Sequence, residues 1–358
     1  MIFPKQGTHY ANTMKKGILT EILLLVILAA AVVKQTADTR ASSFSLEKAA
    51  VSDYIKWVDF TVSYEALCKA YEWDVDTYGS AHEIDWIDLL ACTAAATGGE
   101  FDKKALSSLN KTAKSLAEGK ATVSELAQGL KYFSYYKEVY EAVLGGMLGE
   151  FEEESVDENG EKRFQTVYGL KAYFPLAKGF DYTHYDDFGA GRSFGYQRKH
   201  LGHDMMGQIG TPIIAIESGY VEALGWNAYG GWRIGIRSFD GKRYYYYAHL
   251  RQNYPYAENL ENGSVVTAGD VIGYMGHTGY STKENVNNIK VVHLHWGMEL
   301  IFDESQKEGD NEVWIDVYPL TRFLARHAQA AEKKEGSREW VRSTRMRDPL
   351  AQAALGKK

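Results

Sequence analysis

The stretch that decides the fold runs from Trp232 to His249 and has the sequence WRIGIRSFDGKRYYYYAH. Two runs rich in isoleucine or tyrosine, Trp232–Arg237 and Arg243–His249, lie on either side of Phe239-Asp-Gly-Lys242. An Asp-Gly pair between two such runs is typical of a β-hairpin, because glycine accepts the backbone conformations that a tight turn needs. This stretch therefore predicts two antiparallel strands.

Further short runs of β-forming residues lie on both sides of this hairpin, separated by Gly and Asp turns. They are Thr211–Ile216, Tyr220–Leu224, Val271–Met275 and Val291–Glu299. Short strands that follow one another without long helices between them predict an antiparallel β-domain. We expect this domain over residues 166–320.

The residues before this domain have the pattern of helices, and we predict an all-α domain over residues 45–150. Ser80-Ala-His-Glu83 and Thr122-Val-Ser-Glu125 have the form of capping boxes, which satisfy free backbone amides at a helix start. Gly98-Gly99 predicts the end of the first of these helices, and the second extends through Tyr136. The other predicted helices lie within Ser45–Trp73, with a break, and over Lys103–Ala117. No motif in this block indicates its role.

Two charged segments flank the β-domain. Residues 151–165 are acidic and rich in turn-forming residues, so we predict a linker there. Residues 321–358 are rich in basic side chains with interspersed glutamates, which predicts a charged C-terminal tail. The chain as a whole is expected to be of the α+β class.

The N-terminus has the pattern of an export signal. Three lysines within residues 1–16 precede the apolar run Ile18–Val33, which Glu21 interrupts. The uninterrupted part is shorter than the roughly 20 residues that a spanning helix needs. Residues 17–33 therefore fit both a cleaved signal peptide and an uncleaved membrane anchor, followed by a linker over residues 34–44. Either alternative leaves the N-terminus in the cytoplasm and exports the rest of the chain.

Charge and cysteine content narrow the function further. The formal net charge of −7 argues against a nucleic-acid partner. The chain has only two cysteines, Cys68 and Cys92, so a metal would have to be held by histidine and carboxylate ligands. Both cysteines lie in predicted helices, where two free buried thiols and one disulfide are both compatible with the sequence.

Histidines are concentrated in the predicted β-domain, where six of the ten lie between residues 200 and 295. His293 and His295 alternate along a predicted strand, so both side chains point to one face, with Cα atoms roughly 6.5 Å apart. His200 and Asp204 share a face on a strand or on a helix. Histidine and carboxylate together are common metal ligands, so these residues predict a metal site.

A fifth candidate residue follows the tyrosine-rich run of the hairpin. If the strand that ends at His249 pairs with the strand that carries His293 and His295, three imidazoles converge. Imidazoles beside a metal are suited to hydrolysis, because they exchange protons near neutral pH.

Six motifs in this order resemble those of the LytM-type (lysostaphin-like, M23) zinc metallopeptidases. They are Arg198–Asp204, Gly210–Gly219, Tyr247–Leu250, Val266–Gly273, Gly276–Ser281 and His293–His295. Together they extend over about a third of the chain. The resemblance implies a two-sheet antiparallel β fold with a groove over a zinc ion. It also implies endopeptidase activity on the peptide stems or bridges of bacterial peptidoglycan.

The resemblance assigns a role to each candidate residue. His200, Asp204 and His295 would hold one zinc ion, and no further cofactor is expected. Three protein ligands leave a fourth position for water, whose pKa zinc lowers to about 7. The chain has no HExxH glutamate to act as the base. We therefore assign proton transfer to His293 and orientation of the water or stabilisation of the oxyanion to His249, and these two roles are exchangeable.

The sequence departs from the family pattern at two places. Residues Thr282–Val292 intervene before the last motif, and we expect them to border the groove. Trp296-Gly297 stands where the family usually has Phe-Glu, which removes a carboxylate.

The expected function is that of an exported zinc metalloendopeptidase of the bacterial cell envelope, tethered to the cytoplasmic membrane or secreted. Its substrate is expected to be a peptidoglycan peptide, with glycine bridges, D-Ala–diamino acid crosslinks and stem-peptide bonds all as candidates. The alternative is a non-catalytic LytM-type scaffold, or an activator of other wall hydrolases. Such members typically lack a metal ligand, whereas His200, Asp204 and His295 are all present here.

Overall fold

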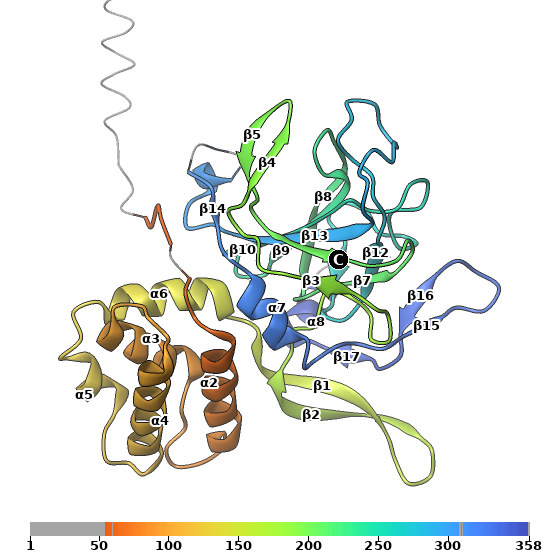
Figure 1. Ribbon diagram of the computed structural model, residues 1–358. Coiled ribbons are helices and arrows are strands. Elements are labelled where there is room, and N and C mark those ends of the chain that lie inside the picture. Colours follow the sequence, from red (N-terminus) through yellow and green to blue (C-terminus); the bar gives the residue numbers. More distant parts are fainter. Residues whose placement is uncertain (1–53, 59, 308, 310, 357–358) are drawn as a thin grey trace, which may run out of the picture. The chain divides into compact units, whose positions relative to one another are not determined.

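The computed structural model describes residues 54–356, apart from residues 59, 308 and 310 (Figure 1). The predicted N-terminal segments, residues 1–16, 17–33 and 34–44, lie outside the described part of the chain. Within the described part, no helix combines the length and apolar character needed to cross a membrane. Residues Ile55–Lys358 belong to one compact unit, in which helices precede antiparallel sheets, and this confirms the α+β class.

Helices α2 to α6 form the first part of the described chain. Their bounds are Tyr64–Thr77 (α2), Trp86–Thr97 (α3), Lys103–Ala117 (α4), Val123–Ala127 (α5) and Phe133–Leu144 (α6). Helix α4 has the predicted bounds. Helix α3 ends at the predicted glycine, because Gly98 adopts a left-handed φ of 72° and donates its N–H to the carbonyl of Ala94.

The prediction of a capping box at Ser80 is wrong. Helix α3 begins later, at Trp86, and its N-cap is Asp85. Glu83 instead accepts a hydrogen bond from the backbone N–H of Gly79 at 2.8 Å and so stabilises the preceding turn.

The prediction of a capping box at Thr122 and Glu125 is confirmed, since each side chain accepts from the backbone amide of the other residue. The helix that follows is shorter than predicted. Helix α5 ends at Ala127, and α6 starts separately at Phe133.

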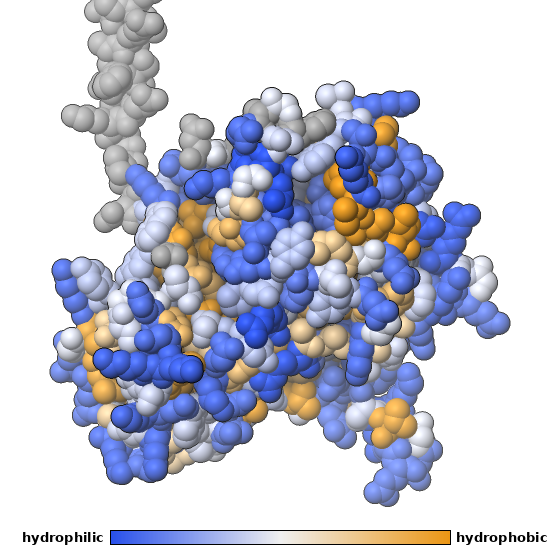
Figure 2. All heavy atoms as spheres, in the orientation of Figure 1, coloured by the Kyte–Doolittle hydropathy of each residue, from blue (hydrophilic) through white to orange (hydrophobic). Residues whose placement is uncertain are grey.

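The acidic segment forms a β-hairpin, not the linker that we predicted over residues 151–165. Strands β1 (Leu148–Val156) and β2 (Lys162–Leu170) pair antiparallel along their whole length. Asp157 closes the turn by accepting hydrogen bonds from two backbone amides that follow it. Hydrophilic residues cover most of the face of the molecule shown in Figure 2, which includes this hairpin. The turn-forming residues thus connect two strands of one sheet.

Residues 321–356 are folded, in contrast to the charged tail that we predicted over residues 321–358. Their elements are α7 (Tyr318–Leu324), β15 (Ala331–Lys333), β16 (Trp340–Arg342), β17 (Met346–Arg347) and α8 (Pro349–Leu355). Strand β17 pairs with β1, where Glu152 lies opposite Arg347. The end of the chain therefore completes a three-stranded sheet with the hairpin.

The predicted antiparallel β-domain is present as an eight-stranded sheet in the order β11-β8-β9-β10-β13-β6-β3, with β14 also paired to β13. The strands are β3 (Thr183–His184), β6 (His203–Met206), β8 (Gly219–Asn227), β9 (Gly231–Ser238), β10 (Arg243–Ala248), β11 (Val265–Val266), β13 (His293–Leu300) and β14 (Val313–Trp314). The predicted hairpin is β9–β10. Smaller antiparallel pairs are β4 (Gly191–Phe194) with β5 (Tyr196–Lys199), and β7 (Pro212–Ile214) with β12 (Val271–Tyr274).

Alternation along β10 and β13 separates a core face from a site face. Tyr245, Tyr247, Trp296 and Met298 are fully buried in the core. The alternate residues lie on the other face, where His295 is opposite Ala248 and Gly297 is opposite Tyr246. One face of the central strands therefore packs on the core, and the other face is available to ligands.

The helical part packs directly on the β-domain. The ring of Phe323 in α7 lies 5.6 Å from that of Tyr71 and 5.9 Å from that of Trp86. Arg243, at the start of β10, is 1% exposed and donates to the carbonyls of Glu141 and Ala142 at the end of α6. The two parts thus share one core.

Candidate active site

Two strands bring the first pair of candidate ligands together. Strands β6 and β13 pair so that Asp204 lies directly opposite His295. Residues opposite each other in an antiparallel pair point to the same face, so the carboxylate and the imidazole meet. His200 lies just before β6, where its N–H donates to the carbonyl of Ala190 and fixes the entry to the strand.

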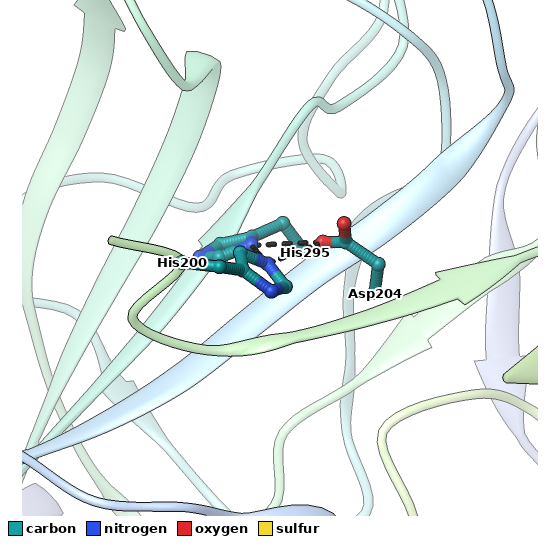
Figure 3. A group of neighbouring side chains, drawn as sticks. All are labelled: His200, Asp204 and His295. Atoms are coloured by element: carbon teal, nitrogen blue, oxygen red, sulfur yellow. Dashed lines mark hydrogen bonds and ion pairs between the residues drawn. The ribbon is translucent and has the colours of Figure 1, made fainter. Parts of the chain in front are cut away.

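Figure 3 shows that the side chains of His200, Asp204 and His295 converge on one point. His200 Nε2 lies 3.0 Å from Asp204 Oδ1 and 3.0 Å from His295 Nδ1, and the last two atoms are 2.9 Å apart. Among the described residues, these three form a group able to hold a metal ion. Each separation is well below twice the zinc–ligand distance of about 2.0–2.1 Å, so one ion can contact all three atoms. Two imidazoles and a carboxylate are also a donor set that zinc accepts.

Electrostatics keep the carboxylate in the form that binds a cation. Burial raises the pKa of Asp204, but hydrogen bonds from His200 and His295 outweigh burial and hold that pKa well below its usual range. Burial is the main cause that lowers the pKa of His295. An ionised carboxylate and an imidazole that favours its neutral form are the states in which both residues bind metal.

Asp187 orients His200, and the sequence did not identify it. His200 Nδ1 lies 3.2 Å from the backbone oxygen of Asp187 and 3.1 Å from its carboxylate. An Nδ1–H directed to these oxygens leaves Nε2 available to a metal. Arg192 contacts the Asp187 carboxylate and lies 3.4 Å from Asp204 Oδ2, so it links both carboxylates. No local sequence signal marks Asp187, because only the fold brings it to His200.

His249 and His293 lie side by side next to this group. Their ring centroids are 4.6 Å apart, and that of His249 is 5.8 Å from that of His295. Each Nδ1 lies 2.9 Å from a backbone carbonyl, that of Thr278 for His249 and that of Val291 for His293. A proton on each Nδ1 leaves Nε2 as a proton acceptor.

The backbone of His249 is in an unusual conformation. Its φ of 62° lies in the left-handed region, and its N–H donates to the carbonyl of Gly230 at 2.7 Å. Non-glycine residues held in this region concentrate at functional sites. Burial, followed by the neighbouring His293 and His295, holds the pKa of His249 well below its usual range, so the ring is neutral at neutral pH.

A groove of about 440 Å³ opens over these five residues. Tyr229, Tyr246 and Tyr280 contribute aromatic walls. The inserted segment also lines it through residues 288–291, which confirms that the insertion borders the groove. The groove gives an extended ligand access to the candidate metal site.

Residues outside the predicted site have structural roles. His203 is buried at 1% exposure, and its Nε2 lies 2.8 Å from His184 Nδ1 on the opposite face of the strand. His277 directs Nδ1 to the carbonyl of Ile289. Cys68 and Cys92 are buried free thiols, so the disulfide alternative is wrong.

The fold and the site define an α+β protein whose antiparallel β-domain carries a candidate metal centre on the floor of a groove. Residues 198–308 match the model of peptidase family M23. The part of the chain that carries the candidate site is therefore similar to peptidase family M23.

Two curated proteins that are similar to part of this chain carry the names of peptidases. The L-Ala–D-Glu endopeptidase of Bacillus subtilis strain 168 is 36% identical over 160 residues, which cover 45% of this chain and 46% of that protein. Lysostaphin of Staphylococcus simulans is 39% identical over 94 residues, or 26% of this chain and 18% of lysostaphin. The matches thus span less than half the length of these curated relatives.

A lytM structure from Ruminococcus gnavus ATCC 29149 has 23% identity and a TM-score of 0.48, covering 78% of this chain and 93% of that one. The catalytic domain of lysostaphin from Staphylococcus simulans has 31% identity and a TM-score of 0.31, covering 39% of this chain and 92% of that one.

Proposed function

We propose that this protein is an exported zinc metalloendopeptidase that hydrolyses peptide bonds of bacterial peptidoglycan. The observation that carries the proposal is the convergence of His200, Asp204 and His295 beside His249 and His293 in one groove. The similarity to peptidase family M23 and the names of the relatives support the reaction class.

The metal would be held by His200 Nε2, Asp204 Oδ1 and His295 Nδ1. A zinc ion bound by these atoms supplies Lewis-acid activation of a water molecule and of the scissile carbonyl. Asp187 holds His200 in the orientation that binding requires. The ionised Asp204 offsets part of the positive charge of the cation.

His293 is the proposed general base. Its Nε2 accepts the proton, and Asp204 Oδ1, at 3.7 Å from that atom, stabilises the imidazolium that forms. His249 is neutral and fixed through Thr278, so its Nε2 orients the attacking water by accepting a hydrogen bond. The protonated His293 then delivers the proton to the leaving amine.

The proposed substrate is the stem peptide, with the bond between L-Ala and D-Glu as the preferred site. The L-Ala–D-Glu endopeptidase of Bacillus subtilis, which is 36% identical over 45% of this chain, carries the name of this bond. A glycine bridge, suggested by the name of a glycyl-glycine endopeptidase that is 38% identical over 89 residues, is the second candidate.

The proposed location is the cell envelope, outside the cytoplasmic membrane. The basic N-terminus and the apolar run Ile18–Val33 support export, either with a retained anchor or after cleavage. Fractionation of cells that produce the full chain, with N-terminal sequencing of the product, distinguishes these outcomes. Recovery of the intact chain in the cytoplasm would contradict export.

The decisive experiment digests purified cell walls with the zinc-loaded protein and identifies released peptides by mass spectrometry. We expect new termini at one peptide bond of the stem, with no release after chelation or in the His200→Ala variant. A zinc-loaded protein that produces no new termini from walls of any crosslink type would overturn the enzyme proposal. A biological role that survives His200→Ala would instead support the non-catalytic scaffold.

A further inference from the structure

A second hollow of about 410 Å³ continues the groove along the same face of the sheet. It shares Arg198, Tyr229, Tyr246 and His295 with the groove over the candidate metal site. A substrate bound at the metal site therefore has a direct path into this second hollow, which the proposed chemistry does not use.

Glu299 lies in the second hollow on the same strand as the catalytic residues. It is four residues beyond His295 on β13, which places the two Cα atoms roughly 13 Å apart on one face. It lies opposite Tyr244 on β10 and Trp314 on β14. The side chain is only 2% exposed.

One oxygen of the Glu299 carboxyl group lacks a partner. Its Oε1 is buried and has no hydrogen-bond partner among the described residues. Leaving a buried acceptor unsatisfied costs about 1–3 kcal/mol, and more if the group is charged. A carboxyl group held in this state at the wall of an open hollow is suited to bind a donor that arrives with a ligand.

Arg233 in the same hollow also has unused hydrogen-bonding capacity. It lies on β9, next to Tyr246 on the site face, and its Nε is buried without a partner in the described part of the chain. No described ion pair joins Arg233 to Glu299. The hollow thus contains a carboxyl group and a guanidinium group that do not form an ion pair with each other.

We propose that this second hollow is a substrate subsite for a side chain that ends in an ammonium group and a carboxylate, with Glu299 binding the ammonium and Arg233 the carboxylate. The proposal rests on the proposed function, because it assumes cleavage between L-Ala and D-Glu. The hollow would then bind the side chain of the residue that follows D-Glu in the stem peptide. The free end of a diamino-dicarboxylic acid in a stem peptide has this chemistry.

The charge state of Glu299 is consistent with such a ligand. Burial and then the nearby Glu312 carboxylate raise the pKa of Glu299 to about 8. The charged groups that act on Glu299 are Glu312, Lys307, Arg237 and Glu222, and Lys307 is itself paired with Glu222. An ammonium group binds the ionised form, so Glu299 releases a proton on binding, and affinity rises as the pH increases from 6 towards 8.

Four tripeptides test the assignment with the zinc-loaded full chain. Each is L-Ala-γ-D-Glu-X, where X is meso-diaminopimelate, L-lysine, L-2-aminopimelate or L-norleucine. These residues carry both end groups, the ammonium alone, the carboxylate alone or neither. We expect Glu299→Gln to lower kcat/KM about tenfold to a hundredfold for the two peptides with an ammonium end group. Arg233→Gln should do the same for the two with a carboxylate end group.

Binding of the product-like dipeptide γ-D-Glu-meso-diaminopimelate, measured by calorimetry, separates the subsite from catalysis. We expect Glu299→Gln to weaken this binding at least tenfold and to remove its rise between pH 6 and 8. Glu152→Gln on the β1–β2 hairpin, a strand glutamate remote from the groove, should leave both assays unchanged.

The outcomes distinguish the two proposals. Cleavage of all four peptides at equal rates, unaffected by Glu299→Gln, overturns the subsite and leaves the peptidase proposal standing. Glu299-dependent binding without cleavage of any peptide supports the subsite and overturns the choice of bond. Absence of both binding and cleavage overturns the subsite.

Discussion

Asp204 is the side chain on which the candidate metal site depends most. A single oxygen, Oδ1, lies 3.0 Å from His200 Nε2 and 2.9 Å from His295 Nδ1. Asp204 Oδ1 therefore carries negative charge and is also the atom that both imidazoles contact. Asp187 acts differently, because it contacts the other nitrogen of His200, Nδ1, which does not face Asp204.

We expect Asp204→Asn to abolish wall cleavage and to weaken zinc binding by more than a hundredfold, since the amide keeps the shape but loses the charge. Asp187→Asn, which weakens the orienting contact with His200 and removes the ion pair with Arg192, should weaken binding about 10–100-fold. Competition with a chromophoric chelator measures both affinities. Equal zinc affinity in Asp204→Asn and the parent protein would contradict the assignment.

Gly202 keeps the space that the ring of His295 occupies. A Cβ at this position would lie 2.6 Å from His295 Nε2 and 2.8 Å from the backbone oxygen of Trp296. We expect Gly202→Ala to displace the imidazole and to lower zinc content and activity, while circular dichroism stays unchanged. Gly169→Ala is the matched control, because nothing lies within 4 Å of its added methyl group. Full zinc occupancy in Gly202→Ala would refute this account.

Glu299 should make folding stability depend on pH. Its pKa in the folded state, about 8, is above its ordinary value of 4.5, so its contribution is fully present below pH 4.5 and is lost as pH rises through 8. Glu299→Gln cannot ionise, so we expect it to be more stable than the parent at pH 8, by about 1–3 kcal/mol. This difference should shrink towards pH 5. Urea unfolding at four pH values measures it, and a difference independent of pH would argue against a buried ionisable group.

The candidate ligands could be predicted because the resemblance to the M23 family assigned His200, Asp204 and His295 to the metal. Local pattern contributed less: strand alternation placed His293 and His295 on one face, but it did not give the register that sets Asp204 opposite His295. The contact of Asp187 with His200 depends on the conformation of a loop, so no periodic pattern in the sequence predicts it. Glu299 was also missed, since its burial results from the packing of β10 and β14 on either side.

Helix starts and the acidic hairpin show where local patterns compete. Asp85, not Ser80, begins α3, and the Trp86 N–H donates to the buried carboxylate of Asp74 at 2.8 Å. This tertiary contact favours Asp85 over Ser80 as the N-cap of α3. The spacing of residues in the sequence does not show such a contact. In the hairpin β1–β2, the strands carry charge on both faces, which conceals the alternation that identifies a half-buried strand.

Arg243 at the start of β10 joins the sheet to helix α6. Its Nε donates to Glu217 at 2.8 Å, and its Nη1 donates to the carbonyl of Ala142 at 2.9 Å. We expect Arg243→Met to cost about 3–5 kcal/mol, because it leaves the buried Glu217 carboxylate without its cation. Urea unfolding measures the loss.

The double variant Arg243→Met/Glu217→Gln is the control for this prediction. It removes the orphaned charge, so it should be more stable than Arg243→Met alone, even though Tyr245 loses a charged acceptor for its hydroxyl. A double variant that is less stable than the single one would show that the ion pair is not the main contribution.

The helical part is integral to the folded unit. Phe323 is 1% exposed because α2 and α3 cover it. We expect a fragment of residues 148–358 to expose this surface and to unfold without cooperativity. Tryptophan fluorescence in urea and size-exclusion chromatography test this. A monomeric fragment with the midpoint of the full chain would show that the β-domain folds independently.

The pairing of β17 with β1 determines when the three-stranded sheet can form during synthesis of the chain. Arg347 contacts Glu152 across 195 positions of sequence. A ribosome must therefore synthesise the whole β-domain before the third strand of that sheet exists. A nascent chain that stalls shortly before residue 346 keeps an open strand edge, which proteases and chaperones recognise.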